Sequence, residues 1–134
     1  MTKLADIEGI GSVYARRLKK AGIRSAAALL EKGATPKNRK AIAAASGIGP
    51  KLILEWVNHA DLFRIKGVGG EYSDLLEEAG VDTVVELSKR DPKVLSLKIL
   101  KVNEAEELVR RLPAAKQVAS WVRQAKKLPR RISY

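Results

Sequence analysis

Apolar residues recur along this chain at the spacing of helices rather than in the strict alternation of strands. Two segments, 12–21 and 70–79, show this spacing, and each is followed by a glycine, Gly22 or Gly80, in the position that ends many helices. The segment that comes nearest to a strand pattern, 93–102, fits a helix equally well. We therefore expect an all-α fold built from about ten short helices.

Capping residues predict where several of these helices begin. Ser25 precedes a run of alanines and leucines, and Thr83 is followed three positions later by a glutamate, as in a capping box. Thr35-Pro36 and Asp91-Pro92 each pair a capping side chain with proline at the first helical position, where the missing amide costs no hydrogen bond. Each half of the chain is therefore expected to contain at least two further helices.

The sequence repeats itself at an offset of 58 residues (67 − 9). Ile7-Glu8-Gly9-Ile10-Gly11 returns as Ile65-Lys66-Gly67-Val68-Gly69, and the register continues well beyond it without gaps. After an insertion of about seven residues, Trp56 and Trp121 also match. Because both tryptophans have apolar neighbours, we expect them in the core rather than stacked on bases.

This repeat predicts two units, residues 1–64 and 65–128, followed by a basic tail at 129–134. The tail follows a proline break and has no evident packing partner, which predicts that it is mobile.

Three short segments share a pattern of two glycines around one apolar residue: Gly9-Ile10-Gly11, Gly47-Ile48-Gly49 and Gly67-Val68-Gly69. The glycines let the chain reverse tightly through backbone angles that other residues avoid, while the middle side chain anchors the turn in the core. The free amides and the positive dipole end of the following helix then form a site suited to a phosphate oxygen. A tight turn without any ligand is the alternative.

The segment Ile7-x-Gly9-Ile10-Gly11-x-x-x-Ala15-x-x-Leu18 resembles the helix-hairpin-helix motif of non-sequence-specific DNA-binding proteins. Residues 46–52, with Pro50 and Lys51 after the turn, resemble a second such motif, and residues 65–76 resemble a third. A fourth, expected near 111–116, lacks both glycines and is degenerate. The whole chain is similar to a bacterial family of uncharacterised tandem helix-hairpin-helix proteins. The resemblance implies two tandem helix-hairpin-helix units and a partner that is duplex or structured DNA, with RNA left open.

Carried over by position, the resemblance implies contacts to backbone phosphates without base readout. The turn residues and the cations that follow them would make these contacts: Gly9, Gly11, Ser12, Val13, Arg16, Arg17, Lys20, Gly47, Gly49 and Lys51. The alternative for the cations is an ordinary solvated helix face.

Charge distinguishes the two repeats. The chain carries 26 Lys+Arg against 15 Asp+Glu, a net charge of +11. Residues 1–64 hold 12 basic and 5 acidic side chains, or +7, whereas residues 65–134 hold 14 and 10, or +4. Behind the third glycine pair the side chains are acidic: Glu71, Asp74, Glu77 and Glu78. We therefore expect the third turn to be structural or to contact a basic protein partner.

Other classes of function lack support in the sequence. There is no cysteine, and the single histidine, His59, is expected to be an ordinary helix residue, so neither a thiolate site nor a histidine metal site is expected. No catalytic set assembles, which predicts a non-enzymatic protein without a cofactor. No apolar segment has the length of a membrane span or a signal peptide, so we expect a cytoplasmic protein. A protein-interaction adaptor without nucleic acid is the competing function, and the oligomeric state is left open.

Overall fold

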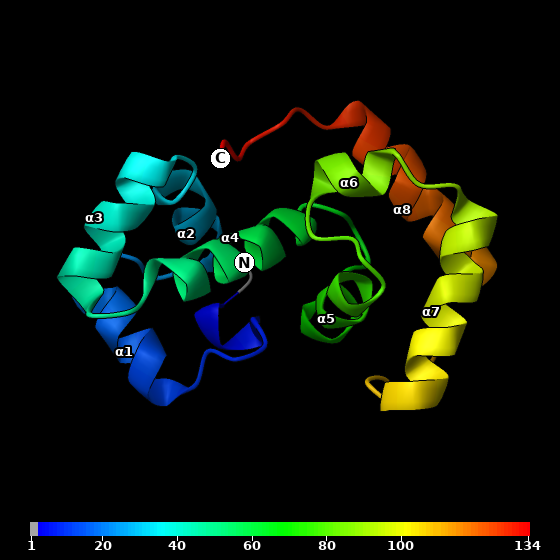
Figure 1. Cartoon of the computed structure of the whole chain (residues 1–134), viewed down its shortest axis with the longest axis horizontal. Coiled ribbons are helices and arrows are strands. Elements are labelled where there is room, and N and C mark those ends of the chain that lie inside the picture. The colour runs from blue at the N-terminus through cyan, green and yellow to red at the C-terminus, as the bar shows by residue number, and fades with distance from the viewer. Residues whose placement is uncertain (1–2) are drawn as a thin grey trace. The chain divides into compact units, whose positions relative to one another are not determined.

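The computed structural model describes residues 3–134, and the regular secondary structure of these residues is helical. The described elements, drawn in Figure 1, are a 3-10 helix (Leu4–Asp6) and the α-helices α1 (Ser12–Lys20), α2 (Ala26–Lys32), α3 (Pro36–Ser46), α4 (Pro50–Leu62), α5 (Gly70–Glu78), α6 (Val84–Ser88), α7 (Pro92–Glu106) and α8 (Ala115–Lys127). No strand occurs in residues 3–134. The all-α prediction is confirmed, with fewer helices than expected, and the ambiguous segment 93–102 lies within α7.

The chain divides into two compact units. The first consists of Met1–Asp61 together with Arg131–Tyr134, and the second of Leu62–Arg130. In the first unit α1 packs against α3 and the 3-10 helix, while in the second α8 packs against α6 and α7, and α7 against α5. Each unit buries one tryptophan, Trp56 or Trp121, at 1% exposure. The prediction that both belong to the core is confirmed.

The predicted helix starts are also confirmed. The side chains of Ser25, Thr35, Thr83 and Asp91 each accept a hydrogen bond from a backbone amide in the first turn of α2, α3, α6 and α7. Pro36 and Pro92 occupy the first helical positions of α3 and α7, where no backbone donor is needed. Local capping chemistry therefore decides where these four helices begin.

Matching glycines end the first long helix of each unit. Gly22 and Gly80 adopt left-handed conformations with φ of 87° and 89°. The amide after each glycine donates to a carbonyl in the last helical turn, at 2.9 and 2.8 Å, which closes a Schellman motif. A cation adds a hydrogen bond to each glycine carbonyl: Lys32, the last residue of α2, at 2.8 Å, and Arg90, which follows α6, at 2.7 Å. The two units thus share their helix endings as well as their helix starts.

The last four residues pack against the first unit. Ile132 is 3% exposed, and the Ser133 amide donates to the carbonyl of Ala34 at 2.8 Å. The buried guanidinium of Arg39 donates to the carbonyls of Gly33 and Ser133, at 2.9 and 2.8 Å. The expectation that this tail has no packing partner is therefore wrong. The hydrogen bonds that hold the tail are made to backbone carbonyls. Every sequence has these groups, so the residues of the tail do not predict the hydrogen bonds.

Candidate functional site

The two glycines of each turn have different roles. Gly9, Gly47 and Gly67 have φ of 92°, 71° and 96°, in the left-handed region that favours glycine. Gly11 and Gly69 have φ of −84° and −108° with extended backbone, which any residue adopts. The prediction that both glycines are needed for the reversal is right for the first of each pair and wrong for Gly11 and Gly69.

Packing does not require the second glycines either. A Cβ atom added at Gly11, Gly49 or Gly69 would meet no atom within 4 Å. Gly11 and Gly69 are the N-cap residues of α1 and α5, and no side chain caps either helix. The first amides of a helix have no partner within it. Glycine at these positions therefore leaves the amides of the first turn open to an acceptor from outside the chain.

A buried tryptophan supports each of these turns from inside its unit. A Cβ on Gly9 would lie 3.5 Å from Nε1 of Trp56, and a Cβ on Gly67 would lie 3.0 Å from Nε1 of Trp121. A half-buried tyrosine from the following helix packs tilted against each tryptophan, with ring centroids 5.2 and 5.4 Å apart; these residues are Tyr14 and Tyr72. These contacts place both tyrosines against the core of their units.

The exposed face of α1 continues from its open N-terminus as a row of polar side chains. Ser12, Arg16 and Lys20 are four residues apart, so they lie on one face, and all three are exposed. Side chains on a helix lean toward its N-terminus, so Arg16 leans toward Ser12 and the free amides. Val13 is 53% exposed beside them. The structure therefore groups Gly11, Ser12, Val13 and Arg16 at the N-terminal end of α1, whereas Lys20 lies on the same face at the other end of the helix.

Arg17 lies at the edge of this face rather than in the row. Its guanidinium carbon is 6.0 Å from the centroid of the Tyr14 ring, within the range of a cation–π contact. The contact joins Arg17 to the ring pair beneath the turn, so this arginine has a structural role beside any role in binding.

The second predicted turn joins α3 to α4 in the same unit. Gly47 ends α3 in the left-handed conformation, and the carbonyl of Gly49 accepts the first hydrogen bond of α4 from Ile53 at 3.2 Å. Pro50 contributes no amide, so the first free amide of α4 belongs to Lys51, whose side chain is exposed. This turn offers one amide fewer than the start of α1 and a single nearby lysine.

The third turn has the backbone of the first with charges of opposite sign. Asp74, Glu77 and Glu78 of α5 occupy the repeat positions of Arg16, Lys19 and Lys20, and their carboxylate oxygens lie within 4.8 Å of one another. The carboxylate of Glu106 on α7 raises the pKa of Glu78, and burial and the neighbouring acids raise it further. The spacing of acidic residues along α5 does not predict Glu106 in this cluster, because Glu106 lies on a different helix. A phosphate near this turn would meet like charge.

The fourth repeat position holds a connector of another kind. Glu107 ends α7 with φ of 48°, and the side chain of Asn103 hydrogen-bonds both the amide and the carbonyl of Val109, at 3.0 and 3.2 Å. At the start of α8, Oε1 of Gln117 accepts from the amide of Ala114 at 3.0 Å. Side chains of Asn103 and Gln117 thus hold this connector, which has neither glycine of the other turns.

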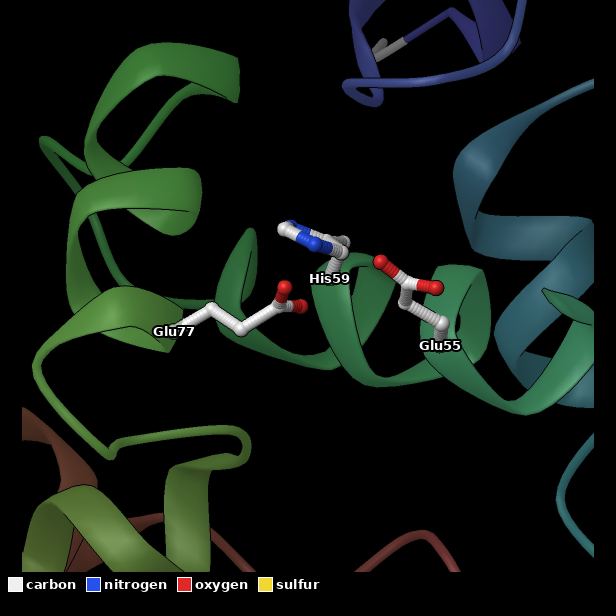
Figure 2. Close-up of side chains that lie close together, drawn as sticks. All are labelled: Glu55, His59 and Glu77. Carbon is white, nitrogen blue, oxygen red and sulfur yellow. The ribbon is translucent and has the colours of Figure 1, made fainter. Parts of the chain in front are cut away.

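Two other features of the described residues bear on function. His59 is 2% exposed on α4, one turn after Glu55, and both side chains are labelled in Figure 2. Within residues 3–134, none of the helices combines the length and the apolar character that crossing a membrane requires.

Comparison with known proteins adds a family without an activity. The model of a family described as a domain of unknown function, DUF4332, matches residues 8–128, which include both glycine-turn units. No curated protein and no solved structure matches the chain. The expectation of an uncharacterised family is confirmed, and the helix-hairpin-helix assignment stays a prediction.

Proposed function

The chain belongs to the DUF4332 family, whose description names no activity, and we propose that it is a non-enzymatic protein of two tandem helix-hairpin-helix units that binds duplex or structured DNA through backbone phosphates. The observation that carries the proposal is the N-terminus of α1. There an N-cap glycine, which neither backbone conformation nor packing requires, leaves amides open one helical turn from exposed Arg16, with Lys20 further along the same face. Amide donors, the positive end of the helix dipole and the Arg16 cation together suit a phosphate oxygen, and Lys20 suits a neighbouring phosphate of the same backbone.

The second unit supports this interpretation by contrast. It has the same left-handed glycine, the same uncapped helix start and the same tryptophan beneath the turn. Only the exterior differs, because Asp74 and Glu78 stand where α1 has Arg16 and Lys20. The turn geometry is therefore compatible with either charge. Because α5 forms the same turn with acidic residues, the fold does not require the basic residues of α1.

Contacts of this kind give binding that depends on salt and not on base sequence. Each phosphate that the protein neutralises contributes about −0.9 to the slope of log K against log salt concentration on duplex DNA. Losing the contacts of Arg16 and Arg17 should therefore make the slope shallower by about 1.8 and weaken binding similarly for unrelated sequences.

The test is fluorescence anisotropy of the full chain with a labelled duplex, a single strand and an RNA duplex, each across a salt series. Arg16→Glu with Arg17→Glu should abolish most duplex binding, whereas Glu77→Gln with Glu78→Gln should not weaken it. Gly11→Val should weaken binding by blocking the amides, and Gly69→Val is its matched control, since both positions are N-caps with open space around them. Equal effects of the two valines, or no binding at low salt, would overturn the proposal.

The acidic face of α5 favours a second function for the second unit, the binding of a basic protein segment. Its carboxylates form one cluster, and the pKa of Glu78 is raised mainly by the charge of Glu106. A cationic partner would relieve that repulsion. Isothermal titration with a lysine-rich peptide would detect it, and Glu77→Gln with Glu78→Gln should remove the heat of binding.

A further inference from the structure

An aliphatic stripe is exposed on α7. Seven large hydrophobic side chains are exposed in the described residues, and three of them, Val94, Leu97 and Leu100, lie on this helix at 65%, 62% and 40% exposure. The opposite face of α7 supplies Leu95 and Ile99 to the core of the second unit. The exposed stripe is thus additional to the face that holds the helix in place.

The matching helix of the first unit has no such stripe. Helices α3 and α7 both begin with a capped proline, Pro36 and Pro92, so residues of α3 correspond to residues of α7 at an offset of 56 (92 − 36). Leu97 and Leu100 then correspond to Ala41 and Ala44, which are also exposed. Alanine occupies these positions in the corresponding helix of the first unit, so the leucines are not needed to form such a helix.

The stripe has opposite charges at its two ends. Lys93, Leu97, Leu100 and Glu104 are spaced by four, three and four residues, the spacing of positions that face a partner helix in a coiled coil, and all four are exposed. The basic residue stands at the start of α7 and the acidic residue near its end.

We propose that this stripe is a self-association surface on which α7 pairs antiparallel with α7 of a second copy of the chain. In that register Lys93 faces Glu104 of the second copy, and Leu97 faces Leu100 of the second copy. Two-fold symmetry repeats each contact, giving two ion pairs around two leucine layers. A parallel pairing would instead set lysine against lysine and glutamate against glutamate, so the charge pattern selects the antiparallel arrangement.

The expected dimer is weak. Helix α7 has 15 residues, a length of about 22 Å, and one helix pair of that length buries less than the roughly 1,200 Å² at the lower end of standard interfaces. The monomer–dimer equilibrium should therefore lie in the micromolar range or above, where it depends on concentration. This surface does not depend on the proposed DNA site, which lies on α1 and α4.

Sedimentation velocity of the full chain, from low micromolar to near millimolar concentration, tests the proposal. The wild type should shift from monomer toward dimer. Leu97→Ala with Leu100→Ala copies the residues of α3 and should raise the dissociation constant by more than about a hundred-fold, with helix content by circular dichroism unchanged.

Charge reversal tests the register. Lys93→Glu alone and Glu104→Lys alone should each weaken the dimer, because each places like charges opposite one another, and the double variant should restore it. Each reversal also suits the helix dipole, with acid near the start and base near the end, so a weaker dimer cannot be traced to a weaker helix. A wild type that stays monomeric at every concentration, or a double variant no better than the single ones, would overturn the proposal. Binding of the monomer to vesicles of anionic lipid, lost with the two alanines, would also overturn it by giving the stripe another occupant.

Discussion

Replacing Gly11 by aspartate should make the protein more stable and its DNA binding weaker. Gly11 is the N-cap of α1 with φ of −84° and ψ of −175°, a conformation open to any residue, and a Cβ there meets no atom within 4 Å. An aspartate at this position would accept hydrogen bonds from the first amides of the helix. Asp91 already does this at the start of α7, accepting from the amides of Lys93 and Val94 at 2.9 and 3.2 Å.

The two effects have different sizes. Aspartate is a better N-cap than glycine by a few tenths of a kcal/mol, and its charge at the positive dipole end adds about 0.3–1 kcal/mol, so the total gain is about 0.5–1 kcal/mol. For a cooperative unit of this size the melting temperature should rise by about 3–6 °C. A phosphate would lose charge-assisted amide hydrogen bonds of about 1.5–3 kcal/mol, so the affinity for duplex DNA should fall by about 10- to 100-fold.

Gly69→Asp is the matched control, because it makes the same change of charge at the equivalent N-cap of α5. Differential scanning calorimetry should show Gly11→Asp to be more stable than the wild type. For Gly69→Asp the neighbouring acids of α5 oppose the capping gain, so its melting temperature should rise less. Anisotropy should show weaker DNA binding only for Gly11→Asp. If Gly11→Asp binds DNA as the wild type does, the amides of α1 do not contact phosphate. If Gly69→Asp loses affinity equally, the loss reflects net charge and not the site.

Three further substitutions test parts of the fold. The pKa of Glu78 is raised, so the stability that its protonated form contributes is present at low pH and is lost as the pH rises through that pKa. By calorimetry, Glu78→Gln should therefore have a higher melting temperature than the wild type at neutral pH and the same melting temperature near pH 4. Gly33→Ala should destabilise the first unit by about 1–3 kcal/mol in urea unfolding, because its Cβ would lie 2.6 Å from Cγ2 of Val57. Arg39→Ala should cost about 2–4 kcal/mol and speed hydrogen exchange of the Ser133 amide, and unchanged exchange would show that Arg39 does not hold the tail.

The sequence predicts local structure well here, because local chemistry decides it. A side chain such as Ser25 or Asp91 caps its own helix within three residues, and Gly9 or Gly22 takes a conformation that its own lack of a Cβ permits. These features are visible to anyone who examines a short window of the chain. They are also the features that repeat between the two units.

Contacts between distant segments were not predictable in this way. Arg39 is held by carbonyl oxygens, one of them 94 positions away, and a carbonyl has no signature in the sequence. Glu106 joins the acidic cluster of α5 because α5 packs against α7, which the spacing of residues along either helix does not show. The different roles of the two glycines in each turn were not predictable for another reason. Both positions hold the same residue type, and only the backbone angles show that the first glycine alone has a positive φ.

That difference separates the requirements of the fold from those of the candidate site. Gly9 and Gly67 serve the fold, because a left-handed backbone disfavours any side chain at both positions, and at Gly67 a Cβ would also lie only 3.0 Å from Nε1 of Trp121. Gly11 and Gly69 do not, because their backbone is ordinary and the space around them is open. The fold does not require the charged residues that follow Gly11 and Gly69 either. Helices α1 and α5 form with basic residues in one and acidic residues in the other at matching positions. Residues that the fold does not require are the candidates for a binding function, and the first turns of α1 hold both such a glycine and such cations.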